Sequence, residues 1–288
     1  MTGSEPAPGI DPRQASPGRV YDCLLGGKDN FAVDRELAEQ ILAHAPRSRW
    51  IVRENRAFLR RAMHYCAEQG IRQFLDLGSG LPTADNVHEV VQRVDRACRV
   101  VYVDNDPMVV AHAQALLADG AGVAAIKGDV RRPAEILRND DVRRLIDFSR
   151  PMAVVMVAIL HFFTDEDDPA GIVARFMEVA ASGSHLVLSH GTHDVRSRQT
   201  AQVSDLYKRA AIPLITRSKC EIDAFFVGLE LVEPGLVFAP QWRPHPGIGP
   251  PESRGPYVAV ARKPSPQDRW DGKRSSISSP VSPKSVRV

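Results

Sequence analysis

From residue 72 to residue 189 the chain alternates short apolar runs with longer segments of helical period. The run at residues 152–159 is continuous and rich in β-branched side chains, which is typical of a central strand buried on both faces. The repeated strand–helix order predicts an α/β fold with a doubly wound, mostly parallel sheet and helices on both faces. Such sheets bind ligands at the carboxyl ends of their strands. The five expected parallel strands are residues 73–77, 99–103, 123–127, 152–159 and 185–189.

Helices are expected between these strands and after the last one, over residues 83–94 with Thr83 as the cap, from Pro107, over 168–180 and over 220–227. Ser218 and Glu221 have the spacing of a capping box at the start of the last helix. Residues 229–238 and 257–261 are expected to add a closing pair of strands.

The segment before the first strand has a different pattern. Residues 33–43 and 50–66 carry apolar side chains at helical spacing, and Gly70 ends the second run. We therefore expect residues 18–70 to form an N-terminal helical lid on a Rossmann-like domain of residues 71–263.

The two ends of the chain, residues 1–17 and 264–288, are rich in residue types that disfavour a packed core, so we predict that both are disordered. Residues 262–288 hold seven Lys or Arg and two Asp or Glu. The other 261 residues then carry 30 basic and 33 acidic side chains. The basic balance belongs to the tail, and the body gives no global sign of nucleic-acid binding.

Cysteine usage and hydropathy bear on the compartment. The longest apolar run, residues 152–160, has nine residues, whereas a membrane-spanning helix needs roughly 20. Residues 1–10 lack the basic and apolar regions of a signal peptide. Scattered cysteines without a Cys-x-x-Cys pair are typical of reduced thiols. We therefore expect a cytoplasmic protein with no membrane segment. The four cysteines are Cys23, Cys66, Cys98 and Cys220.

The strongest functional signal is the sequence Phe74-Leu-Asp-Leu-Gly-Ser-Gly-Leu-Pro-Thr83, in which a strand ends in a glycine turn. Gly78 and Gly80, with Ser79 between them, permit positive φ and close approach of the backbone to a ligand. The Asp76 carboxylate would repel a pyrophosphate but suits a cationic amino-acid group or a hydroxyl. A dinucleotide fingerprint would also place a small residue where this chain has a threonine. The alternative is a plain structural turn.

A second acidic motif follows the next strand. Asp104 stands 24 residues after Gly80, a distance at which a carboxylate can accept both hydroxyls of a ribose. Asn105 beside it is a further candidate contact. Alternatively, Asp104 or Asp106 only caps the helix that follows.

The third motif, Gly128-Asp129-Val130, follows the third strand. Asp129 can accept a hydrogen bond from the exocyclic amine of adenine, or it can be a solvated turn residue, and Val130 beside it is a further candidate contact. Because all three motifs lie at the carboxyl ends of consecutive strands, the sequence predicts one ligand site that they share.

In this order the three motifs resemble those of class I S-adenosylmethionine-dependent methyltransferases, over about residues 72–189. A closer similarity lies in Arg19-Val-Tyr-Asp-Cys-Leu-Leu-Gly-Gly-Lys-Asp-Asn-Phe31 and Asn55-Arg-Ala-Phe-Leu-Arg-Arg61. These segments resemble the signature of an actinobacterial family of S-adenosylmethionine-dependent methyltransferases, formerly a domain of unknown function. Cys23 stands where an aromatic residue is expected. Further matches, which extend the resemblance to about residues 17–262, are Leu81-Pro-Thr83, Leu160-His-Phe162 and Glu230-Leu-Val-Glu-Pro-Gly-Leu236.

The resemblance implies the class I fold and S-adenosyl-L-methionine as cofactor, but no substrate. Within it, residues 26–30 could fold over the cofactor as a lid, and Tyr21 and Asn30 are candidate contacts. The alternative is a solvated, helix-breaking turn. The Arg56 guanidinium could clamp the methionine carboxylate, or Arg56 could be a surface residue of an arginine-rich helix.

His161 follows the fourth strand, at a position that faces cofactor and acceptor in this fold. A histidine with a pKa near 6.5 could act as a general base toward an acceptor hydroxyl or amine. It could instead pack on the cofactor or cap the strand. His190 and His193 lie close together after the fifth strand, but no third well-spaced ligand accompanies them, so we predict no metal site.

The expected function is in-line methyl transfer from S-adenosylmethionine to an unidentified small molecule, without a membrane or nucleic-acid partner. Two alternatives stay open. One is a non-catalytic protein that senses S-adenosylmethionine and docks a partner through its basic tail. The other is an NAD-dependent oxidoreductase, against which the carboxylate of Asp76 argues.

Overall fold

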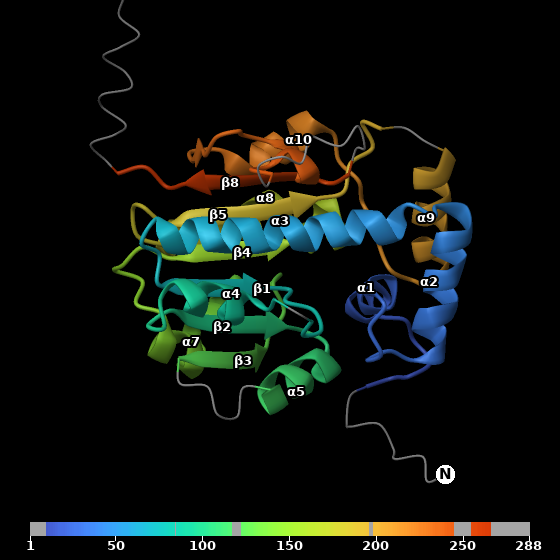
Figure 1. Cartoon of the computed structure of the whole chain (residues 1–288), viewed down its shortest axis with the longest axis horizontal. Coiled ribbons are helices and arrows are strands. Elements are labelled where there is room, and N and C mark those ends of the chain that lie inside the picture. The colour runs from blue at the N-terminus through green and yellow to red at the C-terminus, as the bar shows by residue number, and fades with distance from the viewer. Residues whose placement is uncertain (1–9, 84, 117–121, 196–197, 245–254, 266–288) are drawn as a thin grey trace, which may run out of the picture.

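The computed structural model describes residues 10–83, 85–116, 122–195, 198–244 and 255–265 (Figure 1). Its 8-stranded sheet has the order β3-β2-β1-β4-β5-β8-β6, with β7 also paired to β8. Strands β1 to β5 are parallel, and β8 is antiparallel to β5, β6 and β7. The predicted doubly wound, mostly parallel sheet is confirmed. The strands are β1 Gln73–Leu77, β2 Arg99–Asp104, β3 Val123–Lys127, β4 Ala153–Val157, β5 His185–His190, β6 Glu230–Leu231, β7 Val237–Phe238 and β8 Tyr257–Arg262.

Strand β1 lies at the point where the strand order reverses. Leu75 is paired with Val101 of β2 on one side and with Val154 of β4 on the other. The chain moves outward from β1 to β3 and then returns to the other side of β1 as β4. In sheets of this kind, the crevice at such a reversal is where ligands bind.

Helices cover both faces of the sheet, with α3 and α4 on one face and α6, α7 and α8 on the other (Figure 1). The α-helices are α1 Pro17–Leu25, α2 Ala32–His44, α3 Ser48–Glu68, α4 Val87–Val94, α5 Pro107–Leu116, α6 Pro133–Arg138, α7 Asp140–Leu145, α8 Pro169–Val179, α9 Arg198–Arg209 and α10 Lys219–Asp223. Short 3-10 turns span Leu160–Phe162, Asp165–Asp167, Ala224–Phe226 and Ala239–Gln241.

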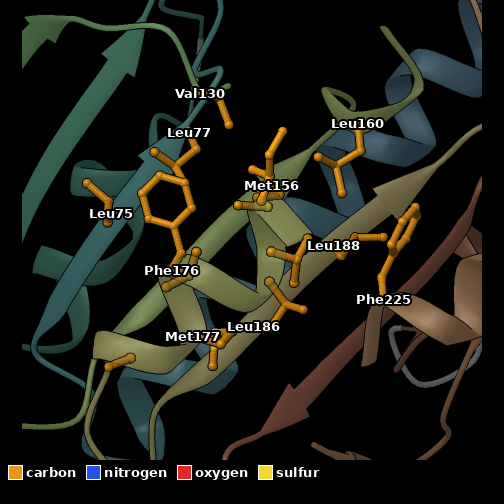
Figure 2. Packing of buried hydrophobic residues seen from close by; sticks show 14 of the residues in the cluster. Leu75, Leu77, Val130, Met156, Leu160, Phe176, Met177, Leu186, Leu188 and Phe225 are labelled. Atoms are coloured by element: carbon orange, nitrogen blue, oxygen red, sulfur yellow. The ribbon is translucent and has the colours of Figure 1, made fainter. Parts of the chain in front are cut away.

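The core consists of two apolar layers that β1 separates. All five residues of β1 are buried. Because side chains alternate along a strand, Phe74 packs in the layer beneath α3 and α4, whereas Leu75 and Leu77 pack in the opposite layer. Figure 2 shows that second layer, where Leu75 and Leu77 lie near Phe176 of α8.

A third apolar cluster lies beyond the carboxyl ends of the parallel strands. There α1, α2 and α9 come together, although α9 is far from the other two in sequence (Figure 1). Leu24, Ile41, Val52 and Leu206 are among its buried side chains. This cluster places a helical layer over the edge of the sheet where ligands are expected.

The N-terminal boundary differs from the prediction. Ala15 is buried, and the Ser16 N–H donates to Asp34 Oδ1 of α2 over 3.0 Å. The prediction of disorder over residues 1–17 is therefore wrong for residues 10–17, because they pack against α2. The tail predicted from residue 264 includes Pro264, which is buried, so the prediction of disorder is wrong for that residue. Residues 1–9 and 266–288 lie outside the described residues.

Two predicted helices also have different bounds. The helix predicted from Thr83 begins at Val87, because the Asn86 N–H donates to Glu89 Oε2 and the Thr83 N–H donates to Asn86 Oδ1. The helix predicted over 220–227 begins behind the expected Ser218 cap, but the α-helix ends at Asp223 and a 3-10 turn follows it.

Candidate functional site

A cavity of about 540 Å³ lies at the carboxyl ends of β1, β2 and β4, beneath α1 and α3. We call it the first cavity. Its walls include two of the three sequence motifs and most of the predicted contacts from the upstream helices. Its walls are residues 14–18, 21, 22, 55, 56, 59, 76, 78–81, 83, 104, 105, 131, 157–159, 162, 163 and 211–213.

The glycine turn after β1 forms the floor of the first cavity. Gly78 and Gly80 have φ of 74° and 65°, in the left-handed region that favours glycine. A Cβ at Gly78 would lie 2.6 Å from the Ile159 side chain, whereas one at Gly80 would meet nothing within 4 Å. The backbone N–H groups of Gly78 and Ser79 donate to Val103 O of β2, which holds the turn in place. The space beside Gly80 is therefore open to a ligand.

Asp76 presents a carboxylate to this cavity although its residue is only 5% exposed. Burial is the main reason that its pKa rises to about 7; the charge of Arg56 lowers the pKa and that of Asp104 raises it further. In the described part of the chain, no group donates a hydrogen bond to this carboxylate. A buried carboxylate in this state favours a cationic ligand beside it.

The sequence left open which of Asp104 and Asp106 caps the helix that follows β2. Asp106 Oδ1 accepts from the Met108 N–H over 2.9 Å, so Asp106 caps α5. Asp104 lines the first cavity; its Oδ2 accepts from the Gly80 N–H and its Oδ1 from the Asp106 N–H, each over 2.9 Å. Burial raises the pKa of Asp104. Asn105 also lines the cavity.

The upstream helices bring two predicted residues to the first cavity. Arg56 of α3 lies beside Asp76, and its Nη2 is 3.4 Å from Asp85 O. Tyr21 of α1 donates its hydroxyl proton to Val52 O over 3.0 Å. Both residues lie in the cavity wall, as a role in ligand binding requires.

A buried arginine holds α1 over the first cavity. Arg19 is 4% exposed, and its Nε lies 2.8 Å from Asp34 Oδ2 of α2. Its Nη1 lies 3.0 Å from Asp106 Oδ2, at the end of β2. This pair of contacts links α1 to α2 and to the edge of the sheet where Asp104 lies.

Three predicted contacts lie outside the walls of the first cavity. The Asn30 amide donates to Asp22 Oδ2 over 2.9 Å, so Asn30 orders a wall residue instead of facing the cavity. Asp129 is paired with Arg131, which itself lines the cavity. Val130 is buried in the core. Direct ligand contact by Asn30, Asp129 and Val130 stays a prediction.

A second cavity, of about 460 Å³, adjoins the first. We call it the second cavity; helices α1, α2, α3 and α9 supply much of its wall. Residues 17, 21, 55, 158 and 162 line both cavities. Its other walls are residues 24, 41, 45, 47, 48, 51, 52, 161, 189, 191, 192, 195, 199, 200, 203, 204, 207, 214, 216, 255 and 256.

His161 lies in the wall of the second cavity, not the first. Burial, His190 and Arg217 lower its pKa to about 3. The Gly191 N–H approaches His161 Nδ1 at 3.4 Å, an arrangement in which the neutral ring carries its proton on Nε2. A group in this state is a poor proton acceptor near pH 7, which does not favour the predicted role as general base.

Two wall residues were not among the predicted ligand contacts. Asn55 is 3% exposed and lies on the buried stripe of α3, where a polar residue among apolar ones was the available signal. Ala158 has a φ of 59°, which is unusual outside glycine, and its N–H donates to Ser189 Oγ. No local sequence pattern predicts that backbone conformation. Both residues stand where the two cavities meet.

Within the described ranges, no three His, Cys, Asp or Glu side chains come together in a way that could hold a metal ion. None of the helices in the described parts of the chain has the length and apolar character needed to cross a membrane.

Comparison with known proteins gives a family and two similar structures. A family model described as S-adenosyl methyltransferase matches residues 3–264. A DUF574 family protein from Streptomyces avermitilis is 41% identical, with a TM-score of 0.84 over 88% of this chain and 99% of that one. A protein from Thermobifida fusca described as a methyltransferase is 40% identical, with a TM-score of 0.86 over 91% of this chain and 99% of that one. No curated protein matches. The chain therefore belongs to the S-adenosyl methyltransferase family, and it is a methyltransferase with S-adenosyl-L-methionine as its cofactor.

Proposed function

We propose that the first cavity holds S-adenosylmethionine and that the second holds a small-molecule acceptor, to which the methyl group passes where the cavities meet. The observation that carries this proposal is the adjoining pair of cavities, with the carboxylates of Asp76 and Asp104 in the wall of the first and five wall residues in common. The family assignment leaves an NAD-dependent oxidoreductase without support.

The chemistry of the first cavity fits this cofactor. Asp76 offers an unpartnered carboxylate for the ammonium group of the methionine moiety, and the nearby Arg56 offers a guanidinium for its carboxylate. Asp104 is the acceptor for the ribose hydroxyls. The open space beside Gly80 lets the backbone approach the ligand closely.

Bound S-adenosylmethionine supplies an electrophilic methyl group on a sulfonium sulfur. The protein's own task is then mainly to align the acceptor and to exclude water, and alignment alone can lower a barrier by ~7–11 kcal/mol. Residues 14–18 and α1 form the cover of the first cavity, fixed by the ion pairs of Arg19. This segment is our candidate lid.

Isothermal titration calorimetry tests the cofactor part of the proposal. The wild-type protein should bind S-adenosylmethionine and S-adenosylhomocysteine and should not bind NADH. Asp104→Asn keeps the side-chain shape but weakens the acceptor, and should lower the affinity for S-adenosylhomocysteine about tenfold. Asp129→Asn tests the predicted contact with the adenine amine at the end of the next strand; because Asp129 lies outside the cavity wall, this change should lower the affinity less than Asp104→Asn does.

Two results would contradict the proposed roles. Unchanged affinity in Asp104→Asn would remove that residue from the ribose site. A larger loss in Asp129→Asn than in Asp104→Asn would move the adenosine toward the end of β3. Methyl transfer to any acceptor, detected as release of S-adenosylhomocysteine, would show that the protein is an enzyme and not a sensor.

A further inference from the structure

The described wall of the second cavity carries few ionisable side chains. Among its described lining residues there is no aspartate, glutamate, lysine or cysteine. Its one arginine, Arg47, is exposed, and its guanidinium carbon lies 5.3 Å from the centroid of the Trp50 ring. Among the described wall residues, a buried cation would find no carboxylate and a buried anion would find only the exposed Arg47, which disfavours a charged ligand.

Four helices and a loop supply apolar side chains to the same cavity. They include Leu24 of α1, Ile41 of α2, Ile51 of α3, Val203 of α9 and Leu214 after it. A cavity of about 460 Å³ with such walls is of the size that binds small organic ligands. The composition favours a molecule that buries mostly carbon.

A single polar atom at the junction of the cavities has no partner. The Tyr21 hydroxyl must donate to Val52 O, because a carbonyl oxygen only accepts. Tyr21 can then only accept from Asn55, so the amide nitrogen of Asn55 faces Tyr21, at 3.0 Å, and the orientation of the amide is fixed. Asn55 Oδ1 is buried and makes no hydrogen bond in the described structure. Such an oxygen requires a hydrogen-bond donor, and the described chain does not supply one.

We propose that the methyl acceptor is an uncharged, largely apolar small molecule that occupies the second cavity and donates an O–H or N–H hydrogen bond to Asn55 Oδ1. This inference rests on the proposed function, because it takes the second cavity as the acceptor site. The ammonium group of the cofactor has the unpartnered carboxylate of Asp76, whereas the reacting group of an acceptor must come to the junction where Asn55 lies.

Two nearly isosteric probes test the hydrogen bond. 2-Naphthol and 2-methylnaphthalene differ in an O–H against a CH₃, and both are small enough for the cavity. Their dissociation constants are measured by fluorescence on protein saturated with S-adenosylhomocysteine. In Asn55→Leu, the affinity for 2-naphthol relative to that for 2-methylnaphthalene should fall about fivefold, which corresponds to the free energy of one neutral hydrogen bond.

Control variants keep the test independent of folding. Gln40→Leu removes an exposed amide on α2, outside the walls of both cavities, and should leave the ratio of the two dissociation constants unchanged. Asn55→Asp retains an acceptor oxygen and should raise the affinity for 2-naphthol relative to that for 2-methylnaphthalene. This variant tests the hydrogen bond if Asn55→Leu does not fold. 2-Naphthoate, which carries a charge on the same rings, should bind the wild type at least about tenfold more weakly than 2-naphthol.

Several outcomes would overturn the inference. The ratio could be the same in the wild type and both Asn55 variants, or 2-naphthoate could bind as tightly as 2-naphthol. Asn55→Leu could weaken S-adenosylhomocysteine and leave the ratio unchanged, which would assign the oxygen to the cofactor. If no probe binds but S-adenosylhomocysteine does, the acceptor class is wrong and the cofactor site stands. Absence of S-adenosylhomocysteine binding would instead contradict the proposed function.

Discussion

Replacing Asp76 with asparagine should separate the stability of the ligand-free protein from its ability to bind the cofactor. Asp76 is buried, and that burial raises its pKa from the ordinary 3.8 to about 7, against the opposing charge of Arg56. One pKa unit corresponds to about 1.4 kcal/mol. Keeping this carboxylate ionised therefore costs the folded, ligand-free protein up to about 4 kcal/mol.

The sign of the effect follows from proton binding. Between about pH 4 and pH 7 the unfolded chain has released the Asp76 proton while the folded protein still holds it. The stability contribution therefore falls as the pH rises through this range and is constant above it. Asparagine has the same shape and no charge, so Asp76→Asn should be more stable than the wild type at pH 8, by about 1–4 kcal/mol. The difference should narrow as the pH is lowered toward 4.

Urea unfolding of the ligand-free protein at pH 8 and pH 5 measures this difference. Titration with S-adenosylhomocysteine in the same buffers should show that the more stable variant has lost at least about tenfold in affinity. Asp129→Asn is the control. Burial raises the pKa of Asp129, but hydrogen bonds from Arg131 outweigh that effect and leave the pKa lowered. Its replacement should therefore not stabilise the protein.

Two results would refute the reasoning. If Asp76→Asn is less stable than the wild type at pH 8, the carboxylate is satisfied in the folded protein and carries no cost. If the variant binds S-adenosylhomocysteine with wild-type affinity, Asp76 does not contact the cofactor.

Three further predictions concern the same region. Because ligand binding should favour ionised Asp76, the wild-type affinity for S-adenosylhomocysteine should fall about tenfold from pH 8 to pH 6, and calorimetry on Asp76→Asn should show no such fall. Arg19→Met leaves Asp34 and Asp106 without their cation and should cost about 3–5 kcal/mol in urea unfolding at pH 7; a cost below about 1 kcal/mol would mean that this pair does not hold α1. Gly78→Ala places a Cβ against a neighbouring side chain at positive φ and should lower stability by about 1–3 kcal/mol, and an unchanged melting temperature would contradict the packing described.

The parallel strands were predictable because their signal is local. The run at 73–77 is β1 to the residue, and the run at 152–159 contains β4. Helix α9 was not anticipated: only Leu206 and Tyr207 are buried in it, too few for an apolar stripe. Helix α9 packs against α2, which lies far from it in the sequence, and no local pattern predicts such a contact.

The candidate site likewise has one part that the sequence predicts and one part that it does not. Asp76, Gly80 and Asp104 meet in one cavity because each lies at or just after the carboxyl end of a strand, and neighbouring parallel strands end at the same edge. The second cavity has no such signal, since it forms between helices that meet only in the folded chain. Asn55 stood beside the predicted Arg56, but its unsatisfied oxygen depends on Tyr21 and Val52, whose positions the sequence does not fix.

The most direct test of the two-cavity account is a crystal structure of the complex with S-adenosylhomocysteine. The account predicts the ribose hydroxyls within hydrogen-bonding distance of Asp104 and the amino group beside Asp76. It also predicts the sulfur at the junction formed by Asn55 and Ala158, facing the second cavity. A ligand whose adenosine occupies the second cavity, or whose ribose lies away from Asp104, would contradict it.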